Sequence, residues 1–126
     1  MEANLLNPPV LAFVGDAVYG LCVREKLSNV NRRSGELHSM SVKLVNAVSQ
    51  AKAFKIIEPC LTEQELAVFK RGRNFHTASS PKNATKGEYH TATGLEALFG
   101  YLHLSGQSDR IKELFNKIWE NFVKEL

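Results

Sequence analysis

Residues 8–27, PPVLAFVGDAVYGLCVREKL, decide the fold predicted for this chain. The segment shows no period-two alternation, and its apolar side chains fall on nearly every side of a helical projection. Pro8 and Pro9 suit the start of a helix, because the first helical residues need no N–H partner within the helix. The segment therefore predicts a buried, central helix that ends near Leu27.

Asp16 does not suit such a buried helix. It lies in the middle of the apolar segment, and an ionised carboxylate is rarely buried without a partner because its desolvation is expensive. Three interpretations remain open at this point. Asp16 pairs with a base, caps a neighbouring helix, or binds a cation.

Helical periodicity continues along most of the chain. A polar connection at 29–34 separates the first helix from a second one expected over about 35–54, whose apolar side chains recur at three- and four-residue steps. Thr62 and Glu65 have the spacing of a capping box, which predicts a short helix that ends near Lys70.

The second half of the chain predicts two more long helices. Residues 71–90 are polar and indicate a loop, with at most a short helix near 73–78. Helices are expected over about 91–104 and from Ser108 onward. The last helix has an apolar stripe made of Ile111, Leu114, Phe115, Ile118 and Phe122.

Length and composition suit a single all-α domain over residues 1–126. The chain has 126 residues, of which 44% are hydrophobic and 23% charged, as in globular proteins. No apolar run approaches the ~18 residues of a membrane span, and no signal peptide is visible. Cys22 and Cys60 form no CxxC pair, which argues against zinc. We expect a cytoplasmic protein with no membrane association.

The net charge of +3 is too small to identify a nucleic-acid-binding protein. The distribution of charge is more informative, because residues 66–90 contain one acid, Glu88, and five strong bases. These bases are Lys70, Arg71, Arg73, Lys82 and Lys86. The segment is either a solvated loop or a loop that contacts nucleic-acid phosphates without reading bases.

Glu96 also allows two interpretations. It follows Thr93 by three residues, which matches a capping box. Alternatively, Glu96 and Asp16 converge on one hard cation such as Mg²⁺, which proteins usually hold with one or two carboxylates and water.

Three segments in order resemble the ribonuclease III family. Residues 11–18, LAFVGDAV, resemble its signature helix, and residues 93–100, TGLEALFG, resemble its second catalytic segment. The third likeness is SGEL at 34–37 followed by LVN at 44–46. The resemblance implies an all-helical, homodimeric endonuclease that cleaves double-stranded RNA to leave 5′-phosphate and 3′-hydroxyl ends. It also implies that Asp16 and Glu96 are catalytic and hold Mg²⁺.

Other segments resemble the Mini-ribonuclease III branch of that family, namely KRGRN at 70–74, PKN at 81–83 and residues 90–104. This likeness implies a catalytic domain without a double-stranded-RNA-binding domain. It implies precursor 23S (large-subunit) ribosomal RNA as substrate, with a ribosomal protein as a candidate helper. The residues expected to bind RNA are Lys70, Arg71, Arg73, Asn74, Lys82, Asn83 and Lys86.

Three acids of the family pattern are replaced in this chain, by Ala12, Ser34 and Thr93. Only Asp16 and Glu96 carry over, which implies a metal shell with more water and weaker binding. The missing acids also favour an alternative, a non-catalytic RNA-binding ribosome-assembly factor of the same fold. A second alternative, a helical protein-interaction module, leaves Asp16 unexplained.

Overall fold

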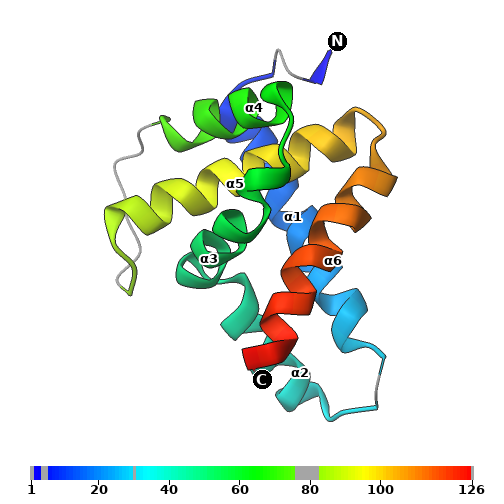
Figure 1. Ribbon diagram of the computed structural model, residues 1–126. Coiled ribbons are helices and arrows are strands. Elements are labelled where there is room, and N and C mark those ends of the chain that lie inside the picture. The colour runs from blue at the N-terminus through cyan, green and yellow to red at the C-terminus, as the bar shows by residue number, and fades with distance from the viewer. Residues whose placement is uncertain (1, 4–5, 30, 76–82, 126) are drawn as a thin grey trace.

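A computed structural model of the protein describes residues 2–3, 6–29, 31–75 and 83–125, which form helices and no strand (Figure 1). The expected all-α fold is confirmed. The elements in chain order are α1 (Pro8–Leu27), α2 (Ser34–Val45), α3 (Ala47–Ile57), the 3₁₀ turn η2 (Glu58–Cys60), α4 (Glu63–Arg73), α5 (Lys86–Leu104) and α6 (Ser108–Glu125).

Helix α5 is the centre of the molecule, because it packs against α1, α3, α4 and α6. Figure 1 shows it crossing α1, with α4 on one side and α3 on the other. Its inner residues Leu95, Leu98, Phe99 and Leu102 are fully buried. The buried part of such a helix is apolar on most of its sides, and Glu96 lies in this part of α5, between Leu95 and Leu98.

The bounds predicted for the first helix are confirmed, but its complete burial is wrong. Leu11 and Tyr19 are buried, whereas Val10, Phe13 and Leu21 expose 44%, 81% and 57% of their surface. Helix α1 therefore has one face in the core and one apolar face in solvent. Asp16 lies on the exposed side. Its carboxylate therefore remains in contact with water and does not carry the full free-energy cost of burial.

The single helix expected over 35–54 is wrong, because the chain breaks at Asn46. Asn46 takes an extended conformation with ψ of 165°, and its side-chain oxygen accepts a hydrogen bond from the N–H of Ser49. An asparagine that caps the next helix in this way ends the preceding one. Helix α2 also begins at Ser34, a residue expected in the connection.

The capping box at Thr62 and Glu65 is confirmed, but α4 continues to Arg73. Helix α5 begins five residues earlier than the expected Thr91, because a second capping box joins Thr85 and Glu88. The loop expected over 71–90 is therefore helical at both ends, and residues 76–82 lie outside the described part.

The capping-box interpretation of Glu96 is wrong. Thr93 lies inside α5, where its hydroxyl donates a hydrogen bond to the carbonyl of Tyr89. Glu96 is consequently a mid-helix residue, and its carboxylate is not used to begin the helix.

The stripe predicted for the last helix is confirmed. Its five members, Ile111, Leu114, Phe115, Ile118 and Phe122, are all buried. Gly106 precedes α6 with φ of 75°, a backbone conformation that glycine adopts readily. None of the described helices has both the length and the apolar character that a bilayer span requires.

Candidate active site

Two glycines bring α1 and α5 into direct backbone contact. A Cβ at Gly15 would overlap the carbonyl group of Glu96, and a Cβ at Gly100 would overlap the carbonyl oxygen of Leu11. Only glycine permits so close an approach. Because Gly15 immediately precedes Asp16, this crossing carries Asp16 to the side of Glu96.

The carboxyl groups of Asp16 and Glu96 lie within hydrogen-bonding reach of each other. Burial raises the pKa of Glu96, and the hydrogen bond to Asp16 and the negative charge of Asp16 raise it further, to about 8. Two like charges at one site disfavour full ionisation. No ion pair joins Asp16 to a base within the described residues, so the interpretation as a paired acid finds no support there.

Gln50 is a third polar group at this site, and no sequence pattern singles it out. It lies in the first turn of α3 and is 2% exposed. Its Nε2 donates to the carbonyl oxygen of Val45 at 2.9 Å and to Oε2 of Glu96 at 3.4 Å. The hydrogen bond to Glu96 lowers the pKa of that carboxyl, opposite to the effect of Asp16.

Tyr19 lies close enough to Glu96 to sense its charge. Burial, followed by the charges of Cys22 and Glu96, raises the pKa of Tyr19 far above its usual value. Its ring packs edge-on against Phe99 and Phe115, with centroid separations of 5.4 and 5.5 Å. The phenol therefore stays protonated and anchors the core near the two carboxyl groups.

The donor groups at this crossing fit a hard divalent cation. Carboxylate and amide oxygens are the ligands that Mg²⁺ takes from proteins. Oε1 of Gln50 is buried and has no hydrogen-bond partner in the described part of the chain, and a cation would relieve the repulsion between the two acids. Among the residues described, no three His, Cys, Asp or Glu side chains form a metal-binding group, so water would complete the shell.

Two of the three residues that replace family acids, Thr93 and Ala12, do not supply further ligands. Thr93 uses its hydroxyl within α5. Ala12 packs against the small apolar cluster of Leu11, Val68 and Ala97. The carboxylates that meet here are those of Asp16 and Glu96.

The residues expected to bind RNA occur at the end of α4 and around the start of α5. In the view of Figure 1 both of these ends lie at the left of the molecule. Lys70, Asn74, Asn83 and Lys86 are exposed, and Lys82 lies outside the described residues.

The two arginines of this set also have contacts within the protein. Arg71 donates a hydrogen bond to the carbonyl of Leu6. Arg73 lies over the ring of Phe69 and donates to the side chain of Asn74. These contacts anchor both side chains near the end of α4.

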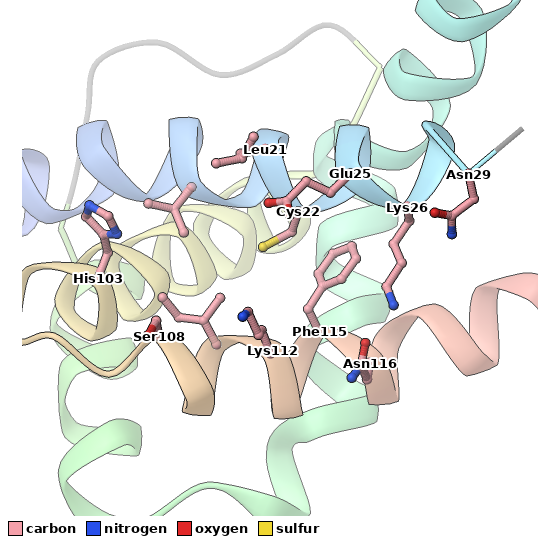
Figure 2. A pocket seen from close by; sticks show the side chains of 12 residues that line it. Leu21, Cys22, Glu25, Lys26, Asn29, His103, Ser108, Lys112, Phe115 and Asn116 are labelled. Atoms are coloured by element: carbon pink, nitrogen blue, oxygen red, sulfur yellow. The ribbon is translucent and has the colours of Figure 1, made fainter. Parts of the chain in front are cut away.

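A separate cavity of about 440 Å³ lies between α1 and α6 (Figure 2). Figure 2 shows Cys22, Phe115 and Lys112 at its wall, and neither Asp16 nor Glu96 lines it. Burial raises the pKa of Cys22 to about 11, so its thiol is a poor nucleophile at neutral pH. The chemistry of the two carboxyl groups is therefore separate from this cavity.

Sequence comparison identifies a family for most of the chain. Residues 9–107 match the model of the ribonuclease III domain. The chain is 46% identical over 114 residues to the Mini-ribonuclease 3 of Brevibacillus brevis, an alignment that covers 90% of this chain and 85% of that protein. It is 44% identical over 110 residues to the Mini-ribonuclease 3 of a Thermoanaerobacter species, covering 86% and 78%.

A solved structure supports the same relationship. The crystal structure of protein FN1578 from Fusobacterium nucleatum superposes with a TM-score of 0.79 and 32% sequence identity. The match covers 92% of this chain and 91% of the other.

Proposed function

Since this chain belongs to the ribonuclease III family and is an endoribonuclease, we propose that Asp16 and Glu96 hold Mg²⁺ and direct the hydrolysis of double-stranded RNA. The observation that carries the proposal is the meeting of these two acids at the glycine crossing of α1 and α5. The family supports double-stranded RNA as the substrate.

The two acids have different roles in this proposal because their surroundings differ. Asp16 is exposed and presents its charge to solvent, whereas Glu96 is half-buried and tied to Gln50. When bound, Mg²⁺ would supply positive charge that promotes deprotonation of the attacking water and offsets charge on the scissile phosphate. Glu96 must be ionised to hold the ion, and the hydrogen bond from Gln50 favours that form.

We propose precursor 23S ribosomal RNA as the natural substrate, which would place the enzyme in the cytoplasm. The names of the relatives support the Mini branch. In this proposal residues 1–126 form the catalytic unit and bind the duplex themselves, with a ribosomal protein as helper. A-form RNA is recognised mainly by shape and phosphates, and the proposed contacts are Lys70, Arg71, Arg73, Asn74, Lys82, Asn83 and Lys86.

A homodimer is part of the same proposal. Val10, Phe13, Ala17 and Leu21 are all exposed and follow one another at three- or four-residue steps on α1. Such spacing aligns them as one apolar stripe, and exposed apolar patches mark interaction surfaces. Asp16 lies beside this stripe, so pairing of two copies would bring their two sites near one interface.

The decisive experiment compares the protein with its Asp16→Asn variant on a long RNA duplex. We expect Mg²⁺-dependent cleavage by the wild type, with 5′-phosphate and 3′-hydroxyl ends, and no cleavage by the variant or in EDTA. Asp16→Asn removes the anionic ligand at nearly constant shape. A melting curve checks that both proteins are folded.

The missing family acids favour one alternative, a non-catalytic ribosome-assembly factor. Duplex binding without cleavage by wild-type protein in Mg²⁺ and Mn²⁺ would support that alternative. Mapping of cut sites on precursor 23S ribosomal RNA then tests the proposed substrate.

A further inference from the structure

Gln50 is a buried polar side chain that core packing alone does not explain. It is buried on α3 together with the apolar residues Ala53, Phe54 and Ile57. Its Oε1 is buried without a hydrogen-bond partner in the described residues, which is unfavourable for a polar atom. Packing against apolar neighbours therefore does not by itself account for a glutamine at this position.

The orientation of the Gln50 amide is fixed by its nitrogen. Nε2 lies 2.9 Å from the carbonyl oxygen of Val45, an atom that only accepts hydrogen bonds. A flipped amide would place two oxygens against each other there. The two hydrogens of Nε2 are therefore used by Val45 and by Oε2 of Glu96.

This arrangement connects the site to the break between α2 and α3. Val45 is the last residue of α2, and Gln50 lies in the first turn of α3, after the extended Asn46 that caps this helix. The Gln50 amide thus connects the backbone carbonyl of Val45, at the end of α2, to one oxygen of Glu96. The same carboxyl group of Glu96 also meets Asp16.

We propose that Gln50 is a positioning residue of the metal site, which holds the Glu96 carboxylate in the orientation that binds the divalent cation. This inference rests on the proposed function of Asp16 and Glu96. It accounts for a buried amide whose nitrogen contacts both the backbone of Val45 and the carboxylate of Glu96. Partners that orient metal ligands typically change metal affinity 10–100-fold when they are removed.

The test measures Mn²⁺ binding to the full chain without RNA, by electron paramagnetic resonance or calorimetry. Gln50→Met keeps the length of the side chain and removes its donors. We expect Mn²⁺ affinity to fall by about 10-fold or more. The melting temperature in metal-free buffer is measured alongside, because the carbonyl of Val45 also loses its donor in this variant. A purely structural role predicts a lower melting temperature with unchanged Mn²⁺ affinity.

Two further variants sharpen the result. Gln107→Met makes the same chemical change in the α5–α6 connection, where Nε2 of Gln107 bonds Ser105, and should leave Mn²⁺ affinity unchanged. Gln50→Leu provides a second apolar replacement if methionine disturbs the fold. In a Glu96→Gln background, Gln50→Met should have no further effect on Mn²⁺ affinity, because the carboxylate that it positions is already absent.

The outcomes separate this inference from the function on which it rests. If Asp16→Asn and Glu96→Gln lose Mn²⁺ binding while folded Gln50→Met and Gln50→Leu bind within twofold of wild type, the positioning role is overturned alone. If Asp16→Asn and Glu96→Gln bind Mn²⁺ like the wild type, the metal site is overturned and the role of Gln50 with it.

Discussion

At the scale of single residues, the site combines two acids that repel each other when both are ionised. The pKa of Glu96 is raised from 4.5 to about 8 by burial and by Asp16. The folded protein therefore binds a proton between these pH values that the unfolded chain releases. Stability must fall as pH rises through this window and level off above pH 8.

We expect Glu96→Gln to abolish cleavage and to raise the melting temperature of the metal-free protein at pH 8. The glutamine side chain cannot ionise, whereas burial and Asp16 disfavour the ionised form of Glu96. The decrease in stability that the wild type shows between about pH 5 and 8 should therefore be smaller in the variant. About 1 kcal/mol corresponds to roughly 4 °C for a domain of this size. Calorimetric melts at several pH values, with and without Mg²⁺, measure the effect.

Glu120→Gln is the matched control, because Glu120 is exposed on α6. It should change neither cleavage nor the pH profile of the melting temperature. Near-normal cleavage by Glu96→Gln would remove Glu96 from the proposed site.

The two acids are predictable from the sequence and Gln50 is not, for a physical reason. A carboxylate in an apolar helix is conspicuous because its burial is expensive. Gln50 is buried in α3, which starts after the break at Asn46. In the uninterrupted helix expected over 35–54, the same position carries no such signal.

At the scale of helices, the geometry of the site depends on the crossing of α1 and α5. No side chain separates the two backbones at Gly15 and Gly100. The positions of Asp16 and Glu96 are therefore fixed by the packing of the helices themselves. A change in that packing should disturb activity and stability together.

We expect Gly15→Ala to lower stability by more than about 2 kcal/mol and to reduce cleavage, because its methyl group would overlap the carbonyl of Glu96. Gly35→Ala is the control, since nothing lies within 4 Å of its Cβ position. Gly35→Ala should gain up to about 1 kcal/mol, because alanine is the better helix former. Urea denaturation of both variants measures the difference, and a stable, active Gly15→Ala would contradict the close crossing.

Helix ends are predictable from the sequence where a side chain marks them. The capping box at Thr62 and Glu65 identifies the start of α4 correctly. The equivalent pair at Thr85 and Glu88 is harder to recognise because it lies in a polar segment with little apolar periodicity. The break at Asn46 contains no glycine or proline, so nothing interrupts the helical period there.

At the scale of the whole molecule, α1 presents an apolar stripe that this chain leaves uncovered. Its most exposed member, Phe13, is 81% exposed. The sequence predicts an apolar α1, but it does not distinguish a core face from a face available to a second copy, because both need apolar residues at the same spacing.

We expect the protein to sediment at close to twice 14.1 kDa and Phe13→Ser to shift it toward the monomer. Removal of this aromatic side chain, which is 81% exposed, takes away apolar area from the proposed interface. Val123→Ser, which changes an exposed valine on α6, should leave the mass unchanged. A wild-type protein that sediments as an active monomer would contradict the proposed dimer.

The basic residues near the end of α4 and the start of α5 lead to a separate prediction about RNA binding. In Asp16→Asn protein, Lys70→Gln with Lys86→Gln should weaken binding to many duplex sequences. It should also reduce the slope of log affinity against log salt by roughly one for each phosphate that the protein no longer neutralises. Titrations at several salt concentrations measure the slope.

Lys117→Gln with Lys124→Gln is the control, because it makes the same change of charge at exposed positions on α6. The contrary outcome is that Asp16→Asn protein has the same slope of log affinity against log salt with and without the Lys70 and Lys86 substitutions. In that case these two lysines contact solvent and not RNA. The arginines are left intact in this test because Arg71 and Arg73 have contacts within the protein.

The glycine crossing of α1 and α5 also determines how the protein loses activity over time. Backbones that touch directly cannot separate by the fluctuation of a side chain, so the crossing opens only when both helices move apart. Amide hydrogens around Gly15 and Gly100 should therefore exchange with deuterated water as slowly as the slowest in the molecule. Inactivation by heat and global unfolding would then proceed at one rate, with no inactive but folded state between them.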